Sequence, residues 1–266
     1  MRVLLNNVLI AMLAFVAAAN ANAVAEDPLD IAGVRIGMTE AEATAALQAF
    51  DPNLEILPVM AVFNYSDGVS HTLESPEFLD RLEGHIGNSG PIFVVHFSGP
   101  DGDVRVIGVK RSAIVQTNQP TAAQFTASLV GKYGQPAGMS RGNKGQPVWE
   151  AAGKTSCVRV RDYKGDVIID VAAGFGESLM TNASAEQFLT SRGASTMGRG
   201  LMPADVAQCG AYLSYWYPGD PISTFSADLY DLGAMVATER SRTAWVSQLQ
   251  DEAVRKRAAQ GQAPKL

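Results

Sequence analysis

The chain has few of the residues from which metal sites and thiol enzymes are built. Among its 266 residues there are only two cysteines and three histidines. The histidines, His71, His85 and His96, stand 14 and 11 residues apart, a spacing that matches no common metal-ligand pattern. We therefore predict no metal site and no bound cofactor.

Several motifs that identify enzymes are also missing. The sequence has no G-x-x-x-x-G-K-[ST] loop and no strand-linked G-x-G-x-x-G, which would bind nucleotide phosphates. It also lacks the G-x-S-x-G turn of many serine hydrolases; Gly87-Asn88-Ser89-Gly90 contains the right residue types without that spacing. The sequence therefore gives no support for a P-loop nucleotide-binding protein, a dinucleotide-binding enzyme or a serine hydrolase of the G-x-S-x-G type. A small-molecule hydrolase whose residues converge only in three dimensions stays as the alternative function.

Long apolar runs are absent after residue 23. No later segment approaches the roughly 18 uninterrupted apolar residues of a membrane-spanning helix. The first 23 residues combine one positive charge (Arg2), a short apolar run (Val8 to Val16) and an A-x-A site that ends at Ala23. These three parts are typical of a secretory signal peptide.

We therefore predict that residues 1–23 are a signal peptide, that cleavage follows Ala23, and that the mature chain has no transmembrane segment. Ala21 and Ala25 also complete A-x-A patterns and are alternative cleavage sites. An uncleaved anchor helix is the other interpretation of this segment. The expected location is the periplasm or the extracellular medium.

Positive charge is scarce in the first half of the predicted mature chain. Residues 24–134 contain 6 Lys and Arg against 14 Asp and Glu, whereas residues 135–266 contain 14 against 13. Nucleic-acid binding depends on basic side chains that displace counterions from phosphates. We therefore predict no nucleic-acid partner. The acidic half is also explained as a solvated surface that keeps the protein soluble.

The two cysteines, Cys157 and Cys209, both lie in the mature chain and are 52 residues apart. In an oxidising compartment two thiols usually form one disulfide. In the chain-entropy model a crosslink over this separation contributes roughly 4 kcal/mol to stability. A catalytic thiol or half of a metal site is less well supported, because no base or closely spaced ligand pair accompanies either cysteine. We predict a Cys157–Cys209 disulfide.

Cap and turn residues divide the mature chain into short helices and strands. Thr39 with Glu42 forms a capping-box pattern, Ser75-Pro76 resembles another helix start, and Gly134 ends a helix that begins after Thr121. The polar, glycine-rich stretch 138–147 predicts a loop. Helices are expected at 39–50, 75–82, 121–133, 185–191 and 233–259, and strands at 54–65, 69–73, 92–97, 104–109, 156–163, 166–172, 210–217 and 222–229.

This order of elements predicts an α+β fold. Tight turns between consecutive strands favour antiparallel sheets, with the helices packed on one face and a long C-terminal helix. A helix followed by hairpins occurs twice, once after Thr39 and once after Thr121. We therefore expect two related modules, residues 24–134 and 135–266. Because the repeat lies in element order and not in residue identity, one continuous domain is the other interpretation.

Two short segments resemble a known group of exported proteins. Residues 31–39 read I-A-G-V-R-I-G-M-T, and residues 132–136 read K-Y-G-Q-P. They are similar to motifs of a bacterial envelope superfamily that includes outer-membrane-assembly lipoproteins of the SmpA/OmlA type and β-lactamase-inhibitor-like modules. The resemblance implies helices laid on an antiparallel sheet and a role in binding other proteins. This chain differs from that pattern because no cysteine follows its apolar run and it is longer than one module.

Aromatic residues supply the candidate binding site. Tyr212, Tyr215, Trp216 and Tyr217 lie on one predicted strand beside a hairpin tip, and Tyr and Trp are typical anchors of binding interfaces. The other interpretation is that one face of this strand packs into the core. A second candidate is the C-terminal helix, whose basic residues lie opposite an apolar stripe. Such a helix could bind a partner protein or an anionic surface. The other interpretation is that it covers its own sheet. Its basic residues are Arg240, Arg242, Arg255, Lys256 and Arg257.

These observations favour binding over catalysis. We predict an exported protein that acts as a protein- or ligand-binding module, with an envelope protein or a small ligand as its partner. The identity of that partner does not follow from the sequence.

Overall fold

The computed structural model describes residues 29–69, 72–87, 90–100, 102–141, 146–181 and 184–260. The predicted signal peptide with its cleavage site after Ala23 lies outside the described residues, as do His71 and Ser89. Within those described ranges, no helix combines the length and the apolar character that crossing a membrane requires.

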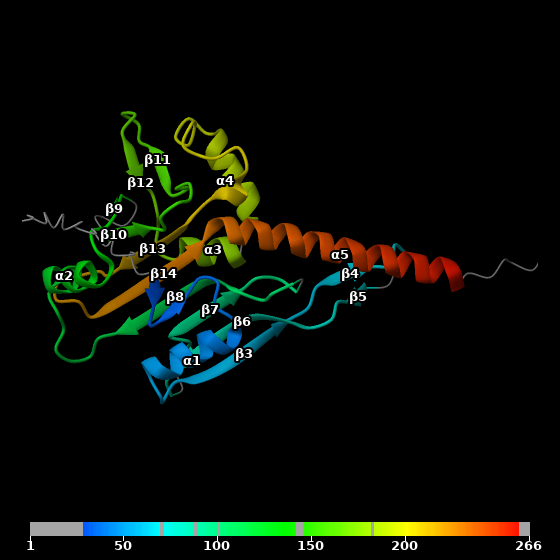
Figure 1. The fold of residues 1–266 in the computed structure, drawn as a ribbon, viewed down its shortest axis with the longest axis horizontal. Helices are drawn as coiled ribbons and strands as arrows, with labels where there is room; N and C mark the ends of the chain where they lie inside the picture. Colours follow the sequence, from blue (N-terminus) through cyan, green and yellow to red (C-terminus); the bar gives the residue numbers. More distant parts are fainter. Residues whose placement is uncertain are drawn as a thin grey trace, which may run out of the picture.

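Most strands belong to one ten-stranded sheet, shown in Figure 1. Its strands are β3 (Glu55–Ala61), β6 (Phe78–His85), β7 (Phe93–Phe97), β8 (Val106–Ile114), β9 (Gly138–Ser140), β10 (Gln146–Glu150), β11 (Arg159–Arg161), β12 (Val167–Ile169), β13 (Ala211–Trp216) and β14 (Thr224–Asp231). Their spatial order is β11-β12-β9-β10-β13-β14-β8-β7-β6-β3. Neighbours are antiparallel except β12 and β9, which are parallel. Two small hairpins, β1 (Asp30–Ile31) with β2 (Val34–Arg35) and β4 (Asn64–Ser66) with β5 (Thr72–Glu74), lie outside this sheet.

The pairing of β8 with β14 lies in the middle of the sheet. It joins seven residue pairs, from Gly108–Tyr230 to Ile114–Thr224. Because β8 precedes Gly134 and β14 follows it, the sheet continues across the predicted boundary between residues 24–134 and 135–266. The relationship between those two segments stays a prediction.

The helices confirm the predicted α+β class. They are α1 (Glu40–Phe50), α2 (Ala122–Tyr133), α3 (Phe175–Thr181), α4 (Ala185–Ala194), the short 3₁₀ helix η1 (Val206–Gln208) and α5 (Leu232–Gln260). Figure 1 shows α5 running from the middle of the sheet outward beside β4 and β5. The long C-terminal helix is therefore present as predicted.

Helices cover both faces of the sheet rather than the single face that the sequence predicts. Leu213 and Leu229 face a core that α1 and α2 complete. The adjacent residues Tyr212 and Tyr230 point to the opposite face and pack with α3, α4 and the first turns of α5. Because successive side chains of a strand alternate between faces, large side chains at adjacent positions need a covering layer on each side.

Local capping chemistry places the first two helices where the sequence predicts them. The Thr39 hydroxyl accepts from the Glu42 backbone N–H at 3.3 Å, and the Glu42 carboxylate accepts from the Thr39 backbone N–H at 2.8 Å. Thr121 and Gln124 form the same reciprocal box at the start of α2. That helix ends at Gly134, whose φ of +75° is accessible to glycine at little cost.

The predicted helix over residues 75–82 is wrong. The Ser75 hydroxyl does not cap a helix: it accepts from the backbone N–H of Phe63 at 2.9 Å and donates to the carbonyl of Pro76. The following residues form β6, which pairs with β3 on one side and β7 on the other. Phe78 and Leu82 are buried there, so sheet pairing and burial override the Ser-Pro signal.

The predicted loop over residues 138–147 is also wrong in part, because Gly138–Ser140 form β9 and Gln146 begins β10. Residues 142–145 lie outside the described ranges. Gly138 has a packing role, since a Cβ atom there would lie 2.8 Å from Cδ1 of Ile169. A glycine that signals a loop in the sequence here permits close contact between strands.

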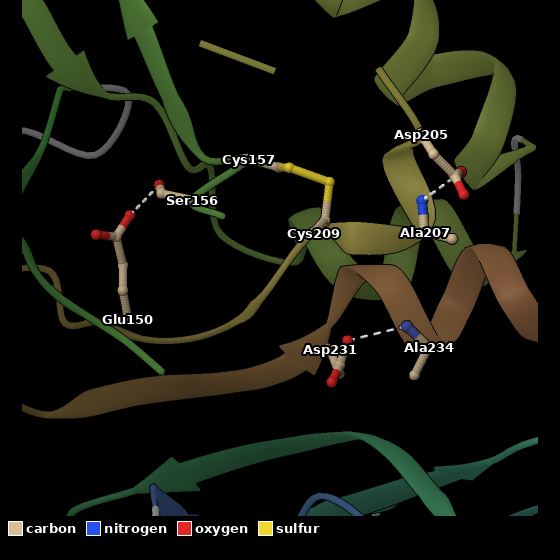
Figure 2. The surroundings of a disulfide bond; sticks show 8 residues. All are labelled: Glu150, Ser156, Cys157, Asp205, Ala207, Cys209, Asp231 and Ala234. Atoms are coloured by element: carbon tan, nitrogen blue, oxygen red, sulfur yellow. Dashed lines mark hydrogen bonds between the residues drawn. A yellow bond between two sulfur atoms is a disulfide. The ribbon is translucent and has the colours of Figure 1, made fainter. Parts of the chain in front are cut away.

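Cys157 and Cys209 form the predicted disulfide (Figure 2), and both residues are buried. The bond ties the segment before β11 to the end of η1, next to the start of α5. Asp205 accepts from the Ala207 backbone N–H at 3.1 Å, and Asp231 accepts from the Ala234 backbone N–H at 2.9 Å. The crosslink and the two carboxylates thus hold η1 and the first turn of α5 in place.

Close packing of α5 on η1 requires a glycine at position 233. A Cβ atom on Gly233 would lie 2.4 Å from the carbonyl oxygen of Ala207 and 2.5 Å from that of Cys209. We expect Gly233→Ala to lower the free energy of unfolding by about 1–3 kcal/mol, because backbone must move. Urea unfolding of the oxidised protein measures this effect.

The matched control is Gly131→Ala in α2, where a Cβ atom meets nothing within 4 Å. Alanine favours a helix by up to about 1 kcal/mol over glycine, so this variant should be neutral or more stable. Equal effects of the two substitutions would contradict the packing argument.

Candidate functional site

A cavity of about 370 Å³ lies between α3, the start of α4 and α5. Its walls are mainly apolar: α3 contributes Leu179 and Met180, α5 contributes Met235 and Val246, and the segment before β4 contributes Phe63. Small-molecule sites are mostly apolar clefts of about 300–1,000 Å³ with a few polar groups. The size and lining of this cavity fit that description.

The polar groups of the cavity come from one face of α5. Glu239 and Arg242 are three residues apart, so both point to the same side of the helix. One carboxylate oxygen of Glu239 accepts from the Ser184 hydroxyl, and the other accepts from the backbone N–H of Glu186 at 3.0 Å. Both donors lie at the N-terminus of α4, where a carboxylate is stabilised by free amide groups. Each oxygen of Glu239 therefore accepts one hydrogen bond from the start of α4.

Arg242 is held differently. Its Nη2 donates to the carbonyl of Phe97 at 3.3 Å and to Asp80 at 3.4 Å, and its guanidinium lies 5.3 Å from the ring centre of Phe78. The side chain is 17% exposed, and its buried Nε has no hydrogen-bond partner among the described residues. Burial lowers the pKa of Arg242, while the Asp80 carboxylate opposes that shift. An arginine retains its charge under such conditions.

A buried polar cluster lies on the face of the sheet that α3 and α5 cover. Asp228 is 1% exposed; one carboxylate oxygen accepts from the backbone N–H of Gly174 at 2.9 Å, and the other has no partner within the described part of the chain. Burial raises the pKa of Asp228 to about 6, although the hydrogen bond from Gly174 and the nearby Lys110 ammonium lower it. Lys110 itself forms an ion pair with Glu177 of α3.

His96 belongs to the same cluster and is neutral at physiological pH. It is 4% exposed, its ring lies 6.1 Å from that of Tyr230, and neither ring nitrogen has a partner among the residues described. Burial lowers the pKa of His96 to about 4. In the described part of the chain, no group of three or more His, Cys, Asp or Glu residues is arranged to hold a metal ion.

The four aromatic residues predicted as a binding site do not share one surface. Tyr212 and Tyr215 are 1% and 6% exposed and lie on opposite faces of the sheet. The Tyr215 hydroxyl is 2.9 Å from that of Tyr133, so it is part of the interior. Trp216 and Tyr217 are half-buried and are the members of the set that a partner could touch. Binding through these two residues stays a prediction.

The C-terminal helix uses several of its basic residues within the protein. Arg240 pairs with Glu186 and Asp205, and Arg257 donates to the carbonyl of Asp67. Arg242 turns inward as described above. The sequence predicts Arg242 opposite the apolar stripe of the helix and gives no sign of its partners Phe97 and Asp80, which are distant in the chain. The sequence offered no signal for the cavity itself.

A second cavity, of about 470 Å³, lies beside Tyr133, Trp149 and Glu150. Glu150 pairs with Arg159 there, and the indole N–H of Trp149 donates to the carbonyl of Gly134 at 3.0 Å. Arg35 and Gln135 also line this cavity. The cavity beside α5 is the better-defined candidate site.

Comparisons with protein-family models, with curated proteins and with solved structures found no match. The resemblance to the SmpA/OmlA and β-lactamase-inhibitor-like group therefore stays a prediction. The two segments that carry it do meet in space. Lys132 forms an ion pair with Asp30, and the Tyr133 hydroxyl donates to the carbonyl of Asp30, which immediately precedes the first segment.

Because the pKa of Asp228 is raised, we predict that the effect of replacing this residue on protein stability depends on pH. The ordinary pKa of an aspartate is 3.8, so the folded state binds the Asp228 proton more tightly than the unfolded state does. The free energy of unfolding therefore falls as the pH rises from about 4 to about 6, where the buried carboxyl becomes charged. We expect Asp228→Asn to gain about 2–3 kcal/mol more unfolding free energy at pH 7.5 than at pH 4. Denaturant titration at the two pH values measures the difference.

The titration of His96 occurs in both proteins and cancels in that comparison. Asp251→Asn, which changes an exposed carboxyl on α5, is the matched control at both pH values. A pH-independent effect of Asp228→Asn would show that the carboxyl is not a buried charge at neutral pH.

Proposed function

We propose that this protein binds a small, largely apolar molecule in the cavity beside α5. The observation that carries the proposal is the cavity itself, about 370 Å³ in volume, with apolar walls from α3 and α5 and a buried arginine. Burial of about 250 Å² of ligand surface would supply about 6 kcal/mol before the entropic costs of association.

We further propose that the protein works outside the cytoplasm, in the periplasm or after secretion. The apolar run before Ala23 and the Cys157–Cys209 disulfide support this location. A disulfide near the start of α5 helps keep the cavity walls in place before a ligand arrives, which lowers the ordering cost of binding.

Binding is favoured over the hydrolase alternative by the state of His96. A general base needs a nucleophile or substrate within hydrogen-bond reach and a pKa near the working pH. His96 is buried, its pKa lies near 4, and among the described residues it has no hydrogen-bonded nucleophile. A complex with an envelope protein through Trp216 and Tyr217 stays as a second mode of binding.

The test places a bulky side chain at an exposed residue of the cavity lining and leaves the buried lining residues unchanged. Thr243 is exposed and lines the cavity, and its hydroxyl donates to the carbonyl of Glu239 on the same helix. We expect the wild-type protein to bind the fluorescent probe 1-anilinonaphthalene-8-sulfonate saturably, and Thr243→Trp to weaken that binding at least about tenfold. Fluorescence titration gives both affinities.

Ala244→Trp is the matched control, because Ala244 is the next exposed residue of α5 and does not line the cavity. Its affinity for the probe should stay within about twofold of wild type. Absence of saturable binding to the wild-type protein, or equal loss in the two variants, would refute the proposed site.

A further inference from the structure

The polar groups that line the cavity differ in how much of their hydrogen-bonding capacity is free. Both oxygens of Glu239 accept hydrogen bonds from the start of α4. The hydroxyl of Thr243 donates to the carbonyl of Glu239. Each carboxylate oxygen of Glu239 is thus engaged once within the protein and keeps a second acceptor position.

Arg242 provides the free donors. A guanidinium has five N–H groups in a planar fork. Its Nη2 makes two long hydrogen bonds, and its Nε is buried without a partner among the described residues. Nε lies against Gly99, where an added Cβ atom would be 3.2 Å from it, so a ligand in the cavity does not reach that N–H. The N–H groups of Nη1 bond to no described residue and are the donors open to an acceptor in the cavity.

The charge of Arg242 is only partly compensated. Asp80 is its nearest carboxylate, and the same carboxylate also pairs with Arg81 at 3.0 Å. Arg242 is largely shielded from solvent beside the stacked rings of Phe63 and Phe78, where an added negative charge interacts with it more strongly than in water. The cavity thus joins an apolar body to a cation with free donors.

We infer that the ligand is an amphipathic carboxylate, with its apolar chain in the cavity and its carboxylate on Arg242. This inference rests on the proposed function. A planar carboxylate matches the fork of a guanidinium with two parallel hydrogen bonds. A neutral alcohol of the same chain length fills the cavity equally well but brings no negative charge to Arg242.

The experiment compares decanoate with decan-1-ol, which share a chain and differ in the head group. Calorimetric titration uses the oxidised protein, expressed from the full chain, at pH 7.5. We expect decanoate to bind about 10- to 100-fold more tightly than decan-1-ol, as charge-assisted hydrogen bonds predict. Arg242→Met should abolish that preference, measured as the ratio of the two affinities.

Arg255→Met is the matched control, since it removes the same charge from an exposed position on α5 that does not line the cavity. It should keep the wild-type preference. Arg242→Lys retains the charge but loses the planar guanidinium, and should reduce the preference for decanoate several-fold. If Arg242→Met fails to fold, the wild-type and lysine ratios decide the question.

The outcomes separate this inference from the proposed function. Equal binding of the two ligands by wild-type protein would overturn the inference and leave the apolar binding site standing. A preference that persists in folded Arg242→Met would also overturn it, because the carboxylate would then lie elsewhere. Binding of neither ligand, together with no saturable binding of the fluorescent probe, would overturn both.

Discussion

The fold depends on the register between β8 and β14. This pairing places Tyr230 opposite Gly108, and a Cβ atom on Gly108 would lie 2.3 Å from the Tyr230 ring. A slip by one residue would move Tyr230 to the other face of the sheet. On the present face α3 lies directly over the tyrosine, because Gly176 permits an equally close approach. Since α5 follows β14 without a break, the same register also sets where that helix begins.

The position of α5 brings the chemistry of the cavity together. Its first turn is fixed by Asp231 and by packing on η1 beside the disulfide, and its far end is held by the contact of Arg257 with Asp67. Between these two anchors, Glu239 reaches the start of α4 and Arg242 reaches β6 and β7. One helix therefore connects the elements around the cavity and supplies its charged groups. The buried carboxyl of Asp228 lies on the sheet face that this helix covers.

Features controlled by neighbouring residues were predictable from the sequence, and features controlled by distant contacts were not. The caps at Thr39 and Thr121 bond residues three positions away, so their patterns identify α1 and α2. The disulfide followed from having two cysteines in a chain with an export signal. The Ser75-Pro76 pattern predicts a helix wrongly, because the partner of Ser75, Phe63, is 12 residues away. The inward turn of Arg242 depends on Asp80, which is 162 residues away, so neither its role nor the cavity was visible in the sequence.

The two open edges of the sheet bear on self-association. A free strand edge can pair with the edge of another molecule and start aggregation. The β3 edge carries Pro58, which lacks a donor, and an irregular register at Val59 and Met60, so it presents an interrupted template. At the opposite edge, β11 is a short strand with Arg159 and Arg161. Each edge thus has a different obstacle to strand addition, and the β3 obstacle lies beside the exposed side chains of Leu57 and Met60.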